Sequence, residues 1–269
     1  MKKAFLISSL SLACLSACKK DPVATPQVPA QQVTTVIQEP VISDTLIVQD
    51  SVQLTETLTA SFNSEALMFE NISDKRLLDS IYAPINLKFT NYSSDDLENS
   101  LLIQRDKFYD EVKKMLTEWS PEFKQTWSQN SKMQLFSKEN DFITLKYASE
   151  GYTGGAHGYY NEIYKVFDLK NKRTLQLADL LKVQDPQIWS RILMDNFLKN
   201  DLDKNQAQML LVKNIPLNNN FYFDNQHVYF LYNQYEIAAY AAGPVLIKVP
   251  FADIKLFLKS DFQSRINIQ

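Results

Sequence analysis

Four of the five glycines in the 269-residue chain lie within one stretch of eight residues, Gly151 to Gly158, which reads GYTGGAHG. Alternating apolar residues precede it in DFITLKYASE and follow it in YNEIYKVFDL, which predicts two strands joined by a loop. A phosphate loop needs GK[ST] before a helix, a dinucleotide loop needs GxGxxG between a strand and a helix, and a nucleophile elbow needs GxSxG. None of these patterns fits. The glycines therefore predict positive φ angles and close backbone approach.

The strand before the glycine stretch is predicted to bury one face. Ile143, Leu145 and Tyr147 alternate with Thr144 and Lys146, as in a strand with one side against a core. Thr144 is therefore expected to face solvent.

The remaining patterns place strands and helices in separate blocks. Ser93 or Ser94 provides an N-cap and acids fill the first turn of a predicted long helix, whose apolar stripe is Leu97, Leu101, Phe108, Val112, Met115 and Trp119. A helix is predicted from Pro186, a hairpin turn at 224–226, and a strand before a closing helix from Pro250. Without a repeating βαβ rhythm, the sequence predicts an α+β fold: a mainly antiparallel sheet with a long helix in the N-terminal half and short helices packed on it.

The chain begins MKKAFLISSLSLACLSACKK, with two lysines, a short apolar run, and small residues that end at Cys18. The apolar run is too short to span a membrane and is typical of a secretion signal. LSAC resembles the bacterial lipobox, in which the signal is removed and the new N-terminal cysteine is acylated. We expect a lipoprotein signal peptide over residues 1–17, a lipid anchor on Cys18, and a bacterial cell-envelope location, with the outer membrane or cell surface favoured. An ordinary signal peptide with a chance cysteine is the alternative.

The segment after Cys18 carries four of the ten prolines, and no aromatic residue occurs between Phe5 and Phe62. Such a composition cannot bury enough apolar surface to offset the entropy of ordering, so residues 18–43 are predicted to be a disordered tether. The next segment, DTLIVQDSVQLTETLTA, alternates like a first strand but also fits the end of a tether. We expect the folded unit to begin near Asp44, with an N-terminal part over 44–140 and a second domain over 141–269.

Composition excludes several kinds of chemistry. Cys14 would leave with the signal and Cys18 would carry lipid, so neither thiol catalysis nor a cysteine metal site is expected. Only His157 and His227 remain as imidazole ligands, without an HExxH pair, and no metal or other cofactor is expected. The net charge is −3 and no Lys/Arg run is interleaved with aromatics, so nucleic acid is not an expected partner.

Two segments carry a resemblance to a known family. YTGGAHGYYNEIYKVFDLKNKRTLQLADLL, from Tyr152 to Leu181, and YEIAAYAAGPVLIKVPFADI, from Tyr235 to Ile254, resemble the RsiV-like domain family, domain of unknown function 3298. Ala239 stands where a proline is common in that family. Residues before about Asp141 resemble the companion domain that precedes it in PdaC-type polysaccharide deacetylases. The resemblance implies an α+β unit in which both motifs contribute to one sheet and its rim.

The resemblance also implies a role outside the cell. One family member is the extracytoplasmic part of an anti-sigma factor that binds lysozyme, and others precede a peptidoglycan deacetylase domain. Because neither a predicted spanning helix nor a deacetylase domain accompanies the motifs, the expectation is a non-catalytic binding module that recognises a lysozyme-like protein or cell-wall glycan.

Binding residues are usually displayed on loops above a rigid sheet, and ten of the thirteen tyrosines lie between Tyr147 and Tyr240. The candidate ligand-binding residues are accordingly Tyr152, Thr153, Gly154, Gly155, His157, Tyr235, Glu236, Tyr240 and Gly243. Structural roles remain open for several of them. In a purely structural role, His157 would hydrogen-bond its own loop and contact no ligand. Tyr235 and Tyr240 would pack beneath a turn at Gly243, and Glu236 would be a buried hydrogen-bond acceptor.

The alternative function is an enzyme that hydrolyses wall glycan. It needs two carboxylates that face each other, one with a raised pKa. The candidates in or beside the motifs are Glu150, Glu162, Asp168 and Glu236. Because no catalytic motif occurs and acidic residues are numerous, catalysis is not expected.

Overall fold

The structure is a computed structural model that describes residues 41–200 and 205–268. The predicted signal peptide, the lipid anchor on Cys18 and nearly all of the predicted tether lie outside the described residues. Among the helices that the structure describes, none has the length and hydropathy that a membrane crossing requires.

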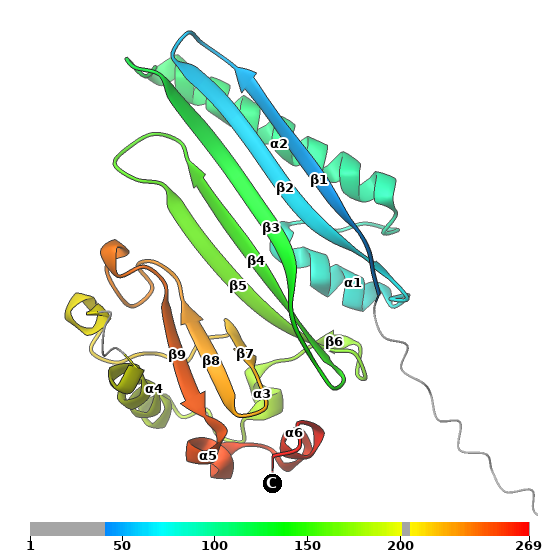
Figure 1. Ribbon diagram of the computed structural model, residues 1–269, viewed down its shortest axis with the longest axis vertical. Coiled ribbons are helices and arrows are strands. Elements are labelled where there is room, and N and C mark those ends of the chain that lie inside the picture. The colour runs from blue at the N-terminus through cyan, green and yellow to red at the C-terminus, as the bar shows by residue number, and fades with distance from the viewer. Residues whose placement is uncertain (1–40, 201–204, 269) are drawn as a thin grey trace, which may run out of the picture. The chain divides into compact units, whose positions relative to one another are not determined.

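Six strands form the larger sheet and pair in chain order (Figure 1): β1 Val41–Gln53, β2 Leu58–Glu70, β3 Gln125–Glu139, β4 Phe142–Tyr152, β5 Tyr159–Asp168 and β6 Arg173–Thr174. Every pairing is antiparallel except β2 with β3, which is parallel. A parallel pair needs a crossover, which contains helices α1 (Lys75–Tyr82) and α2 (Ser94–Glu118). The predicted α+β fold with a mainly antiparallel sheet and a long helix is confirmed.

The first strand begins earlier than predicted. Val41 already pairs with Glu70, so the last three residues of the predicted tether belong to β1. Composition could not reveal this, because the pairing depends on the partner strand and continues past a register shift between Ile42 and Asp44.

Helix α2 confirms most of its predicted features. The Ser93 hydroxyl accepts a hydrogen bond from the Asp96 backbone N–H at 3.1 Å, and the buried residues include most of the predicted stripe: Leu97, Leu101, Phe108 and Val112. The prediction is wrong for the last two residues of the stripe, because Met115 is 36% exposed and Trp119 is 51% exposed. Trp119 lies just past the helix in extended backbone and stacks on Trp127 instead, with ring centroids 6.0 Å apart.

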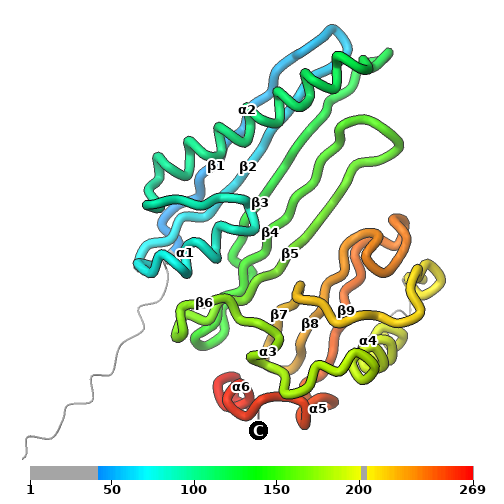
Figure 2. Tube along the Cα trace, turned by 180° about the vertical axis from the view of Figure 1, so that it is seen from behind, coloured from blue at the N-terminus to red at the C-terminus, as the bar shows by residue number. Residues whose placement is uncertain are grey.

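A second sheet holds β7 Phe221–Phe223, β8 His227–Tyr232 and β9 Val245–Pro250, all antiparallel. The accompanying α-helices are α3 Leu177–Leu180, α4 Pro186–Asn200, α5 Phe251–Ile254 and α6 Ser260–Arg265. The expectation that both motifs share one sheet is wrong. The first motif supplies β5 of the larger sheet, whereas the second supplies β9 of the smaller one (Figure 2).

Side-chain amides explain why two sheets form. On the edge of β5 that faces away from β4, the backbone N–H of Tyr164 donates to Asn220 Oδ1 at 2.7 Å and that of Glu162 donates to Asn233 Oδ1 at 2.8 Å. Both asparagines return a hydrogen bond to the Glu162 carbonyl, at 2.8 and 2.9 Å. These amides satisfy an edge that would otherwise remain unpaired, so no seventh strand is needed there.

Two hydrophobic cores lie on opposite faces of the larger sheet. Ile143 and Phe167 join the core under α1 and α2, whereas their neighbours Phe142 and Val166 join the core that includes α4 and the second sheet. This part of the sheet is therefore covered on both faces. Thr144 is only 3% exposed for this reason, so its predicted solvent-facing position is wrong.

Candidate functional site

The glycine stretch closes the hairpin between β4 and β5. As predicted, Gly154 and Gly155 have positive φ angles of 92° and 88°. Gly151 and Gly158 allow close backbone approach instead, because a Cβ added to Gly158 would lie 2.4 Å from the Gly151 carbonyl oxygen. Each glycine in the stretch thus has a conformational or steric reason, and for Gly155, which has open space around it, the reason is the φ angle alone.

The loop is fixed on a pair of stacked tryptophans. A Cβ at Gly154 would lie 3.1 Å from the buried Trp127 ring and 3.7 Å from Trp119. The Tyr152 hydroxyl donates to the Gly155 carbonyl at 3.0 Å, which bridges the turn. The loop is consequently a packed feature of the fold.

His157 of the first motif meets two tyrosines of the second motif. Its ring stacks on Tyr240 with centroids 3.9 Å apart and an interplanar angle of 24°, and the Tyr235 ring lies 6.4 Å from His157 and 5.9 Å from Tyr240. The Tyr240 hydroxyl donates to the Gly158 carbonyl at 3.2 Å. We call His157, Tyr235 and Tyr240 the histidine–tyrosine cluster.

Hydrogen bonds define the tautomer of His157. Its Nδ1 lies 2.9 Å from the Gly158 carbonyl oxygen, which can only accept, so Nδ1 carries the proton. Nε2 is then free to accept from the Tyr235 hydroxyl, 3.4 Å away. His157 therefore bonds its own loop, as the structural interpretation expected, and also links the two motifs.

Tyr235 has an unusual backbone for an aromatic residue. Its φ angle is +66°, in the left-handed region, and its side chain is 58% exposed. The Tyr235 N–H donates to the Ala238 carbonyl at 3.1 Å, which holds the turn in this conformation. The turn thus presents a large aromatic side chain to solvent at a position that favours glycine or asparagine.

The other candidates in the second motif serve the turn. Glu236 is exposed, and its carboxylate accepts from the Asn233 N–H at 3.1 Å, so it caps backbone at the surface and is not a buried acceptor. Gly243 ends a short 3₁₀ helix with a φ angle of +66°. Thr153 lies exposed in the first loop.

The four carboxylates considered for catalysis do not converge as a group. Glu150 and Glu162 share one face of adjacent strands, because β4 and β5 pair Glu150 with Tyr160. Asp168 instead receives two hydrogen bonds from Arg265, at 2.5 and 2.8 Å. Glu236 belongs to the turn described above.

Two of these carboxylates have a lowered pKa, opposite to what a glycosidase acid requires. Burial alone would raise the pKa of Glu162, but hydrogen bonds from Lys146 and Tyr160 outweigh burial and hold it below its ordinary value. Burial would likewise raise the pKa of Asp168, but hydrogen bonds from Arg265 and Asn171 together outweigh burial and lower it. In the described part of the chain, no group of three or more His, Cys, Asp or Glu residues is arranged to hold a metal ion.

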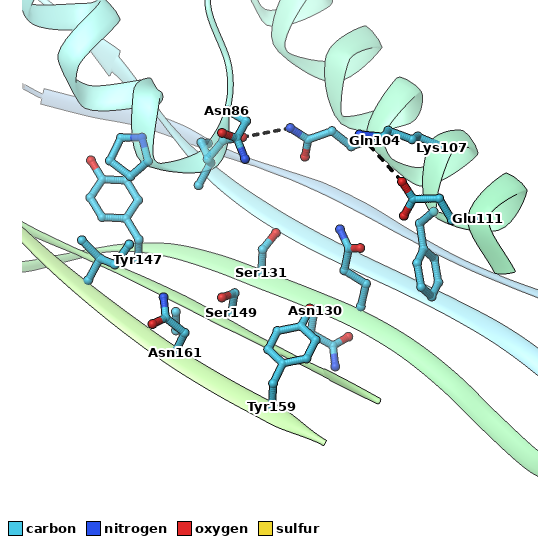
Figure 3. A pocket seen from close by; sticks show the side chains of 16 residues that line it. Asn86, Gln104, Lys107, Glu111, Asn130, Ser131, Tyr147, Ser149, Tyr159 and Asn161 are labelled. Atoms are coloured by element: carbon cyan, nitrogen blue, oxygen red, sulfur yellow. Dashed lines mark hydrogen bonds and ion pairs between the residues drawn. The ribbon is translucent and has the colours of Figure 1, made fainter. Parts of the chain in front are cut away.

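A polar groove that the sequence did not reveal lies between α2 and the sheet (Figure 3). Its volume is about 650 Å³. Its floor includes Ser131, Ser149 and Asn161, which stand side by side on β3, β4 and β5. Ser149 has the same strand parity as the buried Leu145 and Tyr147, so a polar residue in an inward-facing series was the signal available.

Residues 175–252 match the model of the DUF3298 family, described as a protein family of unknown function. The similarity to this family therefore lies in the C-terminal part of the chain. This match covers all but the last two residues of the second motif and only the end of the first. The histidine–tyrosine cluster therefore joins the matched segment to residues before it. No curated protein matches the chain.

Solved structures similar to this chain include two described as members of the DUF3298 family. A member of the DUF3298 family from Bacteroides fragilis has a TM-score of 0.67 at 21% identity, over 86% of this chain and 98% of that one. A DUF3298 family protein from Pseudomonas aeruginosa has a TM-score of 0.49 at 18% identity, over 81% of this chain and 95% of that one. The Bacteroides likeness shows a shared fold that extends well beyond the segment matched by the family model.

Proposed function

We propose that this chain is a non-catalytic, RsiV-like binding module that recognises a lysozyme-like protein or cell-wall glycan. The recognition surface consists of the histidine–tyrosine cluster and the turns that hold it: Tyr152, Thr153, Gly154, Gly155, His157, Tyr235, Glu236, Tyr240 and Gly243. The supporting observation is the stack of His157 on Tyr240 at 3.9 Å, which unites two motifs about 80 residues apart. Aromatic side chains held rigidly at a surface suit both protein hot spots and sugar stacking.

The conformation of Tyr235 supports a binding role. A left-handed backbone costs a non-glycine residue about 1–2 kcal/mol, and an exposed tyrosine recovers little of this by burial. Backbone strain of this kind clusters at functional sites. The engagement of Glu162 by Lys146 and of Asp168 by Arg265 supports a non-catalytic role.

The N-terminal sequence supports a location in the bacterial cell envelope. The lipobox-like LSAC ends at Cys18, where lipid would anchor the chain to a membrane, and the proline-rich segment that follows would act as the tether. In this proposal residues 44–140 form the companion-like part of the folded unit.

The experiment measures binding of the purified full chain to immobilised lysozyme and, separately, to peptidoglycan. We expect saturable binding to at least one of them, and a loss of at least about tenfold in His157→Ala and in Tyr240→Ala. Leu256→Ala is the control, since Leu256 is 88% exposed and belongs to neither motif. Equal binding by all four proteins, or binding to neither ligand, would contradict the proposal.

A further inference from the structure

The polar groove is separate from the histidine–tyrosine cluster and has no role in the function proposed above. Its walls are α2 on one side and β3 to β5 on the other (Figure 3). A volume of about 650 Å³ lies within the range of small-molecule sites. The question is which ligand its lining would recognise.

The lining offers hydrogen-bonding groups that the protein leaves unused. Gln129, Ser149 and Asn161 are half-buried, Asn86 is exposed at the rim, and none of these four side chains bonds to another group in the described part of the chain. Each amide presents two N–H donors and a carbonyl acceptor. The groove therefore offers hydrogen-bond donors and acceptors side by side. This combination suits a ligand whose groups both donate and accept hydrogen bonds, as hydroxyls do.

An aromatic ring borders the same floor. Tyr159 pairs with Gly151 across β5 and β4, and a Cβ added at Gly151 would lie 2.8 Å from the Tyr159 ring. The ring therefore lies over the glycine, and Tyr159 remains 48% exposed. A ring beside free amides and hydroxyls can pack against the C–H face of a sugar while the amides bond its hydroxyls.

Charge argues against other ligand classes. Lys107 and Glu111 are the charged residues of the lining, and they face each other at 3.8 Å with opposite sign. The groove therefore has no cationic surface for a polyanion. Its polar floor also does not match the apolar face of an amphipathic helix.

The groove extends beyond the size of one sugar. A second hollow of about 460 Å³ shares Asn161 and Ile163 with it and adds Asn218, Asn219 and Asn220. Its lining holds one charge of each sign, Lys165 and Glu236. We propose that the polar groove and this adjoining hollow bind a neutral oligosaccharide across β5. The hollow meets the surface proposed above only at Glu236, and the groove variants tested below lie outside that surface, so the two proposals fail separately.

The test is a calorimetric titration of the purified full chain with chitotetraose, cellotetraose and maltotetraose. At least one tetrasaccharide should bind saturably, with a Kd on the order of 1 mM or tighter. Gln129→Ala and Asn161→Ala should each weaken that binding by at least about fivefold. Ser149→Ala serves as a further groove variant if either fails to fold.

The matched control is Gln134→Ala. Gln134 lies on the same strand as Gln129, is also half-buried, and points to the opposite face. Gln134→Ala and His157→Ala should both bind the tetrasaccharide as the unaltered chain does. The absence of saturable binding to all three sugars, or equal binding by the groove variants, would overturn the proposal.

Discussion

At the residue scale, the pair formed by Asp168 and Arg265 ties the end of the chain to the larger sheet. The Asp168 side chain is fully buried, and the Arg265 side chain is 13% exposed. Removing one partner of a buried pair leaves an uncompensated charge, so Arg265→Ala should lower the free energy of unfolding by about 3–5 kcal/mol. Urea denaturation measures this. Arg191→Ala, which breaks an exposed pair with Asp195, should change stability by less than about 0.5 kcal/mol, and equal losses would refute the assignment.

The same pair predicts a pH dependence. Burial would raise the pKa of Asp168, but hydrogen bonds from Arg265 and Asn171 together hold it below the unfolded value of about 3.9. The interaction therefore stabilises the fold above about pH 4 and is lost as pH falls through the folded-state pKa. Below about pH 4, the urea midpoint of the unaltered protein should fall more steeply than that of Asp168→Asn. Parallel pH profiles would show that Asp168 does not carry this dependence.

Tyr235 offers a test that separates binding from folding. Five of the seven non-glycine residues with positive φ among the described residues are asparagines, whose side chain tolerates this backbone well. Tyr235→Asn should therefore be more stable than Tyr235→Ala by about 1 kcal/mol, while both lose binding to lysozyme or peptidoglycan. Thermal unfolding and the binding assay together check this. Retained binding in Tyr235→Asn would remove Tyr235 from the recognition surface.

At the element scale, asparagine side chains replace a neighbouring strand along β5. Asn220→Ala would leave the Tyr164 N–H unpaired and should cost about 1–3 kcal/mol of unfolding free energy. The Tyr164 amide should also exchange with solvent faster. Asn219→Ala changes an exposed neighbour that does not bond β5 and is the control. A similar loss in both variants would mean that the amide contacts are not what closes the edge.

The elements also show what the sequence could predict. Predictions from short sequence patterns are confirmed: Ser93 caps α2, a turn at 224–226 joins β7 to β8, and glycines adopt the positive φ angles of the β4–β5 loop. Non-local packing was missed. Thr144 is buried because a second layer covers the other face of β4, and no pattern within the strand encodes that layer.

At the scale of the whole molecule, the predicted α+β class with a mainly antiparallel sheet is confirmed, but the expectation that both motifs belong to one sheet is wrong. Alternation predicts that a strand has a buried face, yet it does not say which sheet the strand joins. Here side-chain amides from distant segments occupy the edge of β5. The polar groove was missed for a similar reason, since its floor comes from three strands and its wall from α2.

A hydrogen-exchange footprint of the full chain with and without lysozyme, and with and without peptidoglycan fragments, tests whether the two motifs form one recognition surface. A ligand bound to such a surface should slow exchange in residues 152–158 and 235–243 together. The same footprint on His157→Ala should lose protection in both segments. Protection confined to one motif, or to segments outside both, would contradict the claim.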